Sequence, residues 1–352
     1  MAIEIKKLEN SQVEIIGEIA SRTFDDYVEK AIKKLSKNLE ISGFRKGHIP
    51  ENVLVQKVGE GTILEEAADM AMQEEYQKII SDRKIDAIGR PEVTITKLAR
   101  KNPLGFKVKI AVLPEIKLPE YKKLANKTLG KKTEIKVTDS EVEEAILKIR
   151  ETYPNNPTEK EEDGKAETKK ELPKLDDELV KKLGDFKDVT HFKSELKKSI
   201  LQEKELQEKS KQRSLLLDEI LKHTDMILPD VLIESELDRM AIQFKGDVAR
   251  MGVNYEDYIK NAGKTDEDLR NAWRGDAEKR AKTQLLLNEI AQKENISASD
   301  EELNHEVSHI MQHVKKADPE RARHYAQTII TNEKVLQLLE EESVPEKTTQ
   351  AK

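Results

Sequence analysis

The spacing of apolar residues changes along this chain, and the change limits the folds that it can adopt. Apolar and polar residues alternate over 1–20, 92–98 and 106–113, which is the pattern of half-buried β-strands. Between 24 and 81 the apolar residues instead recur at helical spacing. From 175 onward the pattern is helical throughout. The sequence therefore predicts an α+β module followed by an all-α region.

The α+β module has the order strand, strand, helices, strand, strand, and we expect it to cover residues 1–115. That length is enough to bury a core of its own. A short helix is expected from Pro50, with an interruption at 59–61. Thr62 and Glu65 then predict a capping box for the next helix. The first helix carries an apolar stripe made of Phe24, Tyr27, Val28, Ala31, Ile32, Leu35 and Leu39.

The rest of the chain is predicted to contain helices and two polar connections. The first connection contains lysine and proline but little helical periodicity, so we expect it to be extended. Thr138 and Glu141 then predict a capped helix, which is called the arm helix below. The second connection has no large apolar residue from 155 to 170, so burial cannot offset the entropy of ordering it. The expected division is an α+β domain at 1–115, a linker at 116–136, the arm helix at 137–153, a flexible polar tether at 154–174, a helical domain at 175–345 and a disordered tail at 346–352.

Composition favours an elongated protein with many solvated helix faces. Charged residues make up 37% of the chain and aromatic residues 4%, and the mean hydropathy is -0.72. Long helices are expected over 188–223, 229–251 and 265–294, and two more should begin at Ser299 and Asp318.

Several motifs are missing from the sequence, and their absence limits its chemistry. There is no cysteine, which excludes disulfides and thiolate metal sites and fits a reducing compartment. The first residues lack a basic region followed by an apolar core, and no apolar run approaches the roughly 20 residues of a membrane span. No glycine-rich phosphate-binding motif is visible. We therefore expect a soluble, cytoplasmic protein with no membrane partner, no cofactor and no use of ATP.

The segment GFRKGHIP, which begins at Gly43, connects two predicted helices and forms the tip of a helical hairpin. We expect Gly43 to end the first helix in a left-handed conformation and Pro50 to open the second helix. Phe44, Arg45 and Lys46 then lie in solvent, where an exposed ring beside cations favours docking. An ordinary turn with the ring folded back onto the hairpin is the alternative.

Positive charge gathers just before this tip. Between residues 30 and 48 the only acidic residue is Glu40. Such an excess of cations in an acidic protein is typical of a site for phosphates or acidic protein tails, although most charge runs are solvated helix faces. A structural protein whose basic hairpin binds RNA is an alternative function. The cations are Lys30, Lys33, Lys34, Lys37, Arg45 and Lys46.

The tip closely resembles the ribosome-docking signature of the trigger factor family, the bacterial chaperones that meet new chains at the exit tunnel. Its motif is specific, whereas the helical motifs that resemble the same family are weak singly. The further resemblances lie at Thr23 and Phe24, at Gly89-Arg90-Pro91, at Glu171-Leu172-Pro173 with 179–184, and at Leu228-Pro229 with 232–237.

The resemblance implies an α+β N-terminal ribosome-binding domain and an elongated all-α C-terminal chaperone domain with arm-like helices. It also implies that the arm helix packs with the C-terminal domain. It implies an ATP-independent chaperone that docks on protein and RNA of the large subunit at the tunnel exit and shields nascent polypeptides. A homodimer is expected away from the ribosome. The implied ribosome-binding residues are Gly43, Phe44, Arg45, Lys46, Gly47, His48 and Pro50, and the supporting basic face comprises Lys30, Lys33, Lys34 and Lys37.

Members of the family usually carry an FKBP-like prolyl isomerase domain after the arm helix. Such a domain needs a sheet and an aromatic-lined pocket. Here the interval 150–172 is short and polar, with one aromatic residue, Tyr153, and no strand pattern. We therefore expect the isomerase domain to be absent and the chain not to be an enzyme.

A competing motif, HExxH, lies at 305–309 on a predicted helix. Helical spacing places both histidines on one face, with the glutamate as the general base of a zinc protease. The continuation of one protease class is missing, and Glu333 is only nominally available as an acidic ligand. A zinc-dependent metalloprotease is kept as an alternative, and we expect no metal site beyond adventitious binding. The residues concerned are His305, Glu306, Val307, Ser308 and His309, with His313 one turn further on.

Overall fold

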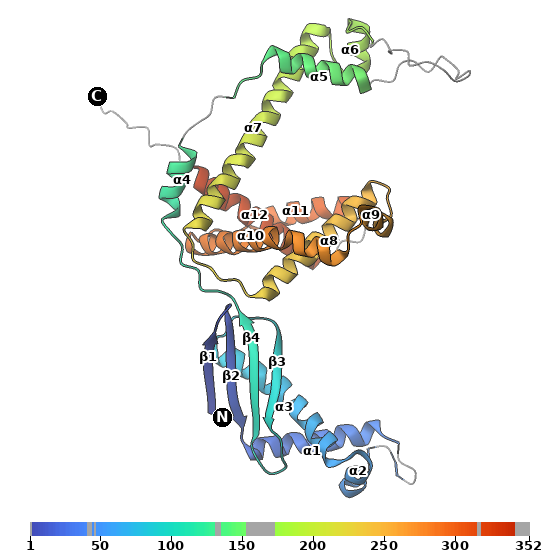
Figure 1. Ribbon diagram of the computed structural model, residues 1–352, viewed down its shortest axis with the longest axis vertical. Coiled ribbons are helices and arrows are strands. Elements are labelled where there is room, and N and C mark those ends of the chain that lie inside the picture. The colour runs from blue at the N-terminus through green and yellow to red at the C-terminus, as the bar shows by residue number, and fades with distance from the viewer. Residues whose placement is uncertain are drawn as a thin grey trace, which may run out of the picture. The chain divides into compact units, whose positions relative to one another are not determined.

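The computed structural model of the chain divides into two compact units (Figure 1). The first unit comprises Met1–Leu118 and Thr224–Gln292, and the second comprises Pro119–His223 and Lys293–Lys352. The structure describes residues 2–40, 44–45, 47–130, 135–152, 173–314 and 318–341. The predicted tether at 154–174 therefore lies almost wholly outside the described residues, as does the predicted tail at 346–352.

The first unit begins with a four-stranded antiparallel sheet in the order β1-β2-β4-β3. Ile15 pairs with Ile5 on one side and with Val108 on the other, so the apolar sets of three strands share a face. This confirms the predicted strand pattern, although β3 begins before the expected residue. The strands are β1 Ala2–Leu8, β2 Gln12–Ile19, β3 Ala87–Lys97 and β4 Leu104–Val112.

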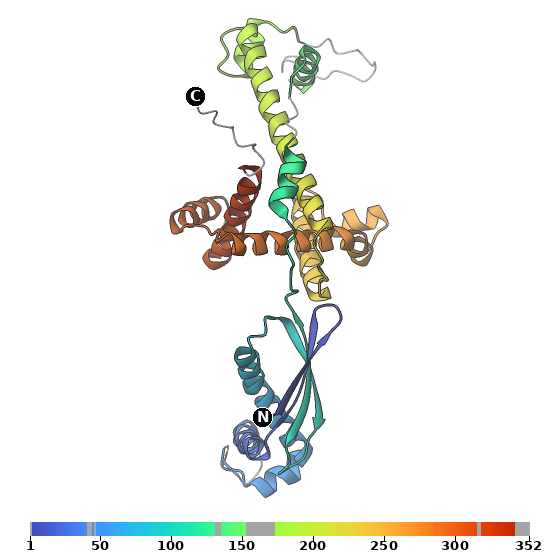
Figure 2. The same ribbon diagram turned by 90° about the vertical axis from the view of Figure 1, so that its left-hand side faces the viewer.

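Helices α1, Ser21–Asn38, and α3, Glu60–Arg83, cover one face of this sheet (Figures 1 and 2). Phe24 of α1 and Phe106 of β4 are fully buried in the shared core. Tyr27 ties the two helices together, because its hydroxyl donates to Glu74 at 2.8 Å and to Glu75 at 3.1 Å. Burial and these two carboxylates raise the pKa of Tyr27 above its ordinary value.

The predicted capping box of Thr62 and Glu65 is wrong. The short helix α2, Glu51–Val58, ends at Gly59, which has a φ of 85°, and α3 begins directly after it at Glu60. Glycine adopts this conformation without strain, so one residue suffices to break the helix. The Thr62 hydroxyl instead donates to the Val58 carbonyl at 2.8 Å.

The first unit continues in α8, Asp230–Arg250, α9, Tyr255–Ala262, and α10, Asp266–Lys293. Leu237 and Ala277 belong to the buried cluster that α8 and α10 share. Beside it Arg270 bonds to Glu234 at 2.8 Å and to Asp238 at 2.7 Å. Arg274 adds bonds to Glu234 at 2.6 Å and to Asp230 at 2.8 Å, so ion pairs join the first half of α8 to the first half of α10.

The second unit is built on α7, which spans Val189–Lys222. Helices α5, Asp139–Thr152, and α6, Asp177–Leu183, lie at its N-terminal end (Figure 1). The buried residues Val142, Ile146, Val180 and Phe192 form the core that joins the three helices. The predicted cap of α5 is confirmed, because the backbone N–H of Thr138 donates to Glu141 at 2.9 Å and that of Glu141 to the Thr138 hydroxyl at 3.4 Å.

The predicted linker at 116–136 is wrong in its middle, where α4 spans Tyr121–Leu129. Tyr121, Ala125 and Leu129 follow one another at helical spacing, and all three are buried. The hydroxyl of Tyr121 donates to Glu294 at 2.5 Å. A stripe of only three apolar residues among lysines is too short to stand out in the sequence, but it is enough to fix a helix of this length against neighbours.

Helices α11, Asp300–His313, and α12, Pro319–Glu341, complete the second unit. The predicted cap at Ser299 is confirmed as a capping box with Glu302. Lys334 and the Ser299 N–H hold the pKa of Glu302 to about 2. No described helix is long and apolar enough to cross a membrane.

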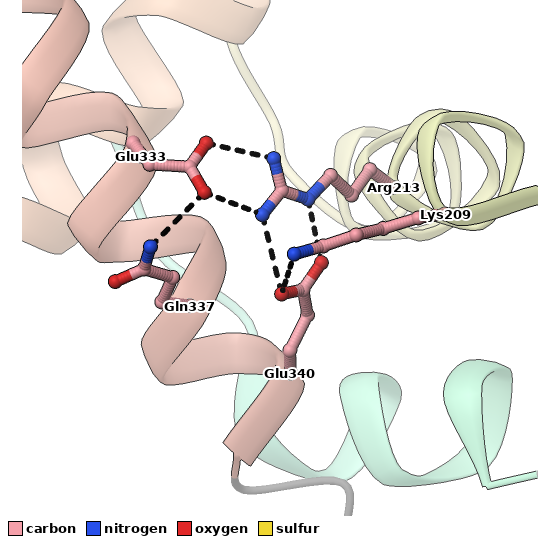
Figure 3. Close-up of polar contacts among 5 residues, drawn as sticks. All are labelled: Lys209, Arg213, Glu333, Gln337 and Glu340. Atoms are coloured by element: carbon pink, nitrogen blue, oxygen red, sulfur yellow. Dashed lines mark hydrogen bonds and ion pairs between the residues drawn. The ribbon is translucent and has the colours of Figure 1, made fainter. Parts of the chain in front are cut away.

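Arg213 of α7 joins that helix to α12 (Figure 3). Its guanidinium donates to both carboxylate oxygens of Glu333 at 2.7 Å and to those of Glu340 at 2.5 and 3.2 Å. Lys209 lies 3.3 Å from Glu340, and the amide of Gln337 donates to Glu333 at 3.1 Å. The Arg213 side chain is 18% exposed, so water screens these pairs only in part.

Candidate functional site

The predicted docking loop follows α1, and its start differs from the expectation. Helix α1 ends at Asn38, and Leu39 is already extended, with its N–H donating to the carbonyl of Leu35 at 3.0 Å. Gly43 therefore does not cap this helix, because several residues separate the two. Gly43 and Lys46 lie outside the described residues.

The second half of the loop is anchored to the buried Ser36. The Ser36 carbonyl accepts from the Gly47 N–H at 2.9 Å, and its hydroxyl accepts from the Ile49 N–H at 3.2 Å. Gly47 has a φ of 81°, which favours glycine there, and the side chain of Ile49 is buried in the core of the first unit. Pro50 then forms the N-cap of α2.

Phe44 and Arg45 project from this anchored base into solvent. Phe44 is 40% exposed as a residue, and Arg45 and His48 are also exposed. Within the described part of the chain, Arg45 forms no ion pair. The backbone N–H of His48 donates to the carbonyl of Arg45 at 3.0 Å, which fixes a tight turn between them. An exposed ring and a guanidinium without an ion-pair partner among the described residues are therefore neighbours in sequence, next to the part of the loop that Ser36 anchors.

Only part of the predicted basic face, made of Lys30, Lys33, Lys34 and Lys37, is available to bind a partner. Lys30 lies 3.5 Å from Glu74, and Lys34 lies 2.5 Å from Glu66, so acidic residues of α3 pair with half of the four lysines. Lys33 and Lys37 have no ion-pair partner among the described residues, and both are exposed. The net charge counted along 30–48 therefore overstates the local excess, because α3 supplies acids from elsewhere in the sequence.

Lys37 lies next to the loop itself. A Cβ placed on Gly47 would lie 3.5 Å from the Cγ atom of Lys37. Among the described cations of the segment 30–48, Lys33, Lys37 and Arg45 have no ion-pair partner in the described part of the chain, so they can bind a phosphate or a carboxylate of a partner. The role of Ser36 in anchoring the loop was not predicted from the sequence. The one indication that the sequence offers is a polar hydroxyl residue beside the apolar stripe of α1.

The histidines of the HExxH motif lie on an exposed part of α11. The rings of His309 and His313 lie 4.6 Å apart. Glu333, the nominal acidic ligand, has both carboxylate oxygens bonded to Arg213. The described residues bring together no group of three or more histidine, aspartate or glutamate side chains that could hold a metal ion. The three-ligand centre that zinc proteolysis requires is therefore not formed by these residues.

Family models match both parts of the chain. A model described as "Bacterial trigger factor protein (TF)" matches residues 1–149, and one described as "Bacterial trigger factor protein (TF) C-terminus" matches 188–350. The first match contains the predicted docking loop, and the second contains all of α7 to α12.

Individual relatives agree with these models. The trigger factor of Halothermothrix orenii is 26% identical over 406 residues, which cover 93% of this chain and 94% of that protein. The trigger factor of Shouchella clausii is 25% identical over 386 residues, which cover 87% of this chain and 88% of that protein.

One solved structure shares the fold over nearly the whole length. It is described as "Promiscuous Substrate Recognition in Folding and Assembly Activities of the Trigger Factor Chaperone". The comparison covers 97% of this chain and 100% of that one, with 22% identity and a TM-score of 0.58. With the two family models, this similarity confirms the fold class expected from the sequence. The chain belongs to the trigger factor family.

Proposed function

We propose that this chain is an ATP-independent chaperone that docks at the ribosomal tunnel exit and shields nascent polypeptides. Membership of the trigger factor family supports a role as a ribosome-associated chaperone. The observation that carries the docking proposal is the pair Phe44 and Arg45, exposed on a loop that Ser36 and Ile49 anchor. A homodimer away from the ribosome stays a prediction.

The chemistry of the loop fits a ribosomal surface. Ribosomal RNA presents phosphates, and an unpaired guanidinium forms short, charge-assisted hydrogen bonds with phosphate or carboxylate oxygens. An exposed ring beside it can pack on an apolar patch or stack on a base. The anchored base matters because the backbone of Gly47 and Ile49 is already held by Ser36, so this part of the loop loses little conformational entropy on binding. Lys33 and Lys37 add positive charge that steers the encounter.

Shielding of clients is attributed to the helices that follow the docking module. Several of their large apolar residues are exposed in the part of the chain that the structure describes. The exposed fractions are 68% for Leu206, 52% for Leu215, 72% for Ile242, 73% for Met251 and 61% for Tyr325. Scattered apolar contacts among charged residues favour weak, short-lived binding, and docking compensates by raising the local concentration near the nascent chain.

We further propose that the chain has no prolyl isomerase domain. The two family models leave residues 150–187 unmatched, which is too short for a domain with its own core. The alignment with the Halothermothrix orenii protein runs over 406 residues, more than the 352 of this chain, so that relative contains residues without a counterpart here.

The isomerase proposal gives a simple expected result. In a coupled assay with a proline-containing peptide, the purified chain should leave the uncatalysed rate of cis/trans isomerisation unchanged. Uncatalysed isomerisation takes tens to hundreds of seconds at about 25 °C, so even modest catalysis would be visible. A rate that rises in proportion to the concentration of the chain would contradict the proposal.

Ribosome docking is tested by co-sedimentation at two salt concentrations. The intact chain should pellet with ribosomes at about 0.1 M salt and much less at roughly 0.5 M, because salt screens exposed charge pairs. Bovine serum albumin is added to the same mixture as a control, because it shows how much protein enters the ribosomal pellet without binding. Absence of the chain from the ribosomal pellet at the lower salt concentration would reject the docking proposal.

A further inference from the structure

The hairpin that joins β3 to β4 ends in an exposed turn, residues 99–103, which we call the β3–β4 turn. The residues on either side of it belong to the core of the first unit. Leu98 packs against that core, and Leu104 is fully buried in it. The core therefore holds both ends of the turn, while all five of its residues are exposed to solvent.

Lys101 occupies a left-handed position in this turn, with a φ of 58°. Glycine and asparagine adopt that conformation with less strain than lysine does. Two hydrogen bonds restrain the backbone around it. The Asn102 N–H donates to the carbonyl of Ala99 at 3.3 Å, and the Asn102 side-chain amide donates to the carbonyl of Arg100 at 3.1 Å. Because asparagine would suit the fold better at position 101, the positive charge of the lysine points to a function.

An ion pair connects the turn to the docking loop. The guanidinium of Arg100 donates to the carboxylate of Glu51, the first residue of α2. Glu51 directly follows Pro50, which is the N-cap of α2 and the last residue of the loop. Both views of the molecule place the β3–β4 hairpin beside α2 (Figures 1 and 2). A surface that meets the anchored end of the loop can therefore also reach the turn.

The turn offers positive charge and hydrogen-bond donors but no large apolar side chain. Its sequence is Ala-Arg-Lys-Asn-Pro, which contains no acidic residue. Lys101 has no ion-pair partner among the residues that the structure describes. Such a turn cannot fill an apolar pocket of a protein, whereas an ammonium group pairs with the phosphate oxygens of a nucleic acid whatever its base sequence. The RNA backbone is therefore the partner that this chemistry fits best.

We propose that the β3–β4 turn makes a second contact with the ribosome, in which Lys101 binds a backbone phosphate of ribosomal RNA. Arg100 acts as a positioning residue, because its ion pair holds the turn beside α2. The inference rests on the docking function proposed above and adds to it a contact of different chemistry. The docking loop combines a ring with a guanidinium, whereas the turn contributes charge alone. Two separate contacts fix the orientation of the α+β module on the ribosome, which a single loop cannot do.

The loss of one phosphate contact changes the salt dependence of binding by a predictable amount. Each contact contributes about 0.7–0.9 to the slope of the logarithm of the binding constant against the logarithm of the salt concentration. Lys101→Asn should therefore reduce this slope by nearly one unit and weaken ribosome binding about five- to eightfold at about 0.1 M salt. Affinity is measured by co-sedimentation of the full chain with ribosomes at roughly 0.1, 0.2 and 0.4 M salt.

Lys84 provides the matched control. It is exposed, has a φ of 50° and has no ion-pair partner among the described residues, but it precedes β3 and so lies at the opposite end of that strand from the turn. Lys84→Asn removes the same charge from the same backbone conformation, so its slope and affinity should equal those of the unaltered chain. Neither variant should lose stability, because asparagine tolerates a left-handed backbone. An unchanged slope in Lys101→Asn, or the same change in both variants, would overturn the proposal.

The identity of the partner is tested by crosslinking. Because the chain contains no cysteine, one introduced thiol can carry an aryl azide label at a single position. Lys101→Cys and Lys84→Cys chains are labelled and irradiated on ribosomes at about 0.1 M salt. Position 101 should give a product that ribonuclease shortens, and position 84 should give none. A product at 101 that contains ribosomal protein and no RNA would overturn the assignment to RNA, and no product at 101 would overturn the contact itself.

Failure of this contact is distinguishable from failure of docking. If the unaltered chain does not pellet with ribosomes, the docking proposal is rejected and this inference with it. A second result separates the two. If the unaltered chain pellets, Phe44→Ala/Arg45→Ala does not, and Lys101→Asn behaves as the unaltered chain does, then docking through the loop stands and the second contact is rejected.

Discussion

The double variant Phe44→Ala/Arg45→Ala is expected to bind ribosomes about 100-fold more weakly than the unaltered chain. A hydrogen bond to a charged group contributes about 1.5–3 kcal/mol, and each 1.4 kcal/mol is a factor of ten in affinity. Loss of the guanidinium contacts therefore accounts for about tenfold or more, and loss of the buried ring surface for a similar factor. Affinity is measured by co-sedimentation at about 0.1 M salt, with the chain titrated against a fixed ribosome concentration.

The fold of this variant should be unaffected, because both side chains are exposed and neither anchors the loop. Ser36 and Ile49, which hold the loop, are left in place. The matched control is Arg321→Ala/Tyr325→Ala on α12, which also removes one exposed arginine and one exposed ring. The control should bind ribosomes as the unaltered chain does. Equal losses in both variants, or no loss in either, would refute docking through the loop.

The predicted docking loop was only partly predictable from the sequence. Exposure of Phe44 was expected from its place between two predicted helices, and the structure places it in solvent. The availability of the neighbouring lysines was overestimated, because Glu66 and Glu74 are remote in sequence and pair with Lys34 and Lys30 only after α1 and α3 pack together. A charge count along a segment cannot include partners that tertiary structure brings to it.

The helices, too, were predictable only where the signal in their own sequence is strong. Long helices such as α7 and α10 were predictable because their apolar spacing extends over many turns and their ends carry cap residues. Helix α4 was missed because its stripe is short, and α9 was missed although Asn254 caps it by accepting from the Glu256 N–H at 2.8 Å. The ion pairs between α8 and α10 were not predictable, since they depend on which faces of the two helices meet.

The contacts of Arg213 are also tertiary, and they carry the largest expected effect on stability. One guanidinium satisfies two carboxylates that belong to another helix, and its removal leaves both acids without that partner. The hydrogen bonds from Arg213 lower the pKa of the Glu333 carboxyl. The hydrogen bonds to Glu333 and Glu340 raise the pKa of the Arg213 guanidinium. Breaking a fully buried pair costs about 3–5 kcal/mol, and the partial exposure of this cluster reduces that figure.

We therefore expect Arg213→Met to lower the free energy of unfolding of the full chain by about 2 kcal/mol at pH 7. Methionine retains most of the apolar stem, so the loss reports the polar contacts. The free energy of unfolding is measured by denaturant unfolding followed by circular dichroism. The control is Arg321→Met, because Arg321 is exposed and has no ion pair among the described residues. Its free energy of unfolding should stay within about 0.5 kcal/mol of that of the unaltered chain.

The ion pair between Arg213 and Glu333 predicts how the loss of stability in Arg213→Met depends on pH. The carboxyl of Glu333 has a lower pKa in the folded chain than in the unfolded one, so its contribution to stability is present above the unfolded pKa of about 4.3. That contribution is lost as the pH falls through the folded value, because protonation then removes the partner of Arg213. The difference between the unaltered chain and Arg213→Met should therefore be constant from about pH 6 to 8 and shrink below about pH 4. A difference that persists unchanged in acid would contradict the proposal that ionised Glu333 carries the stabilisation by Arg213.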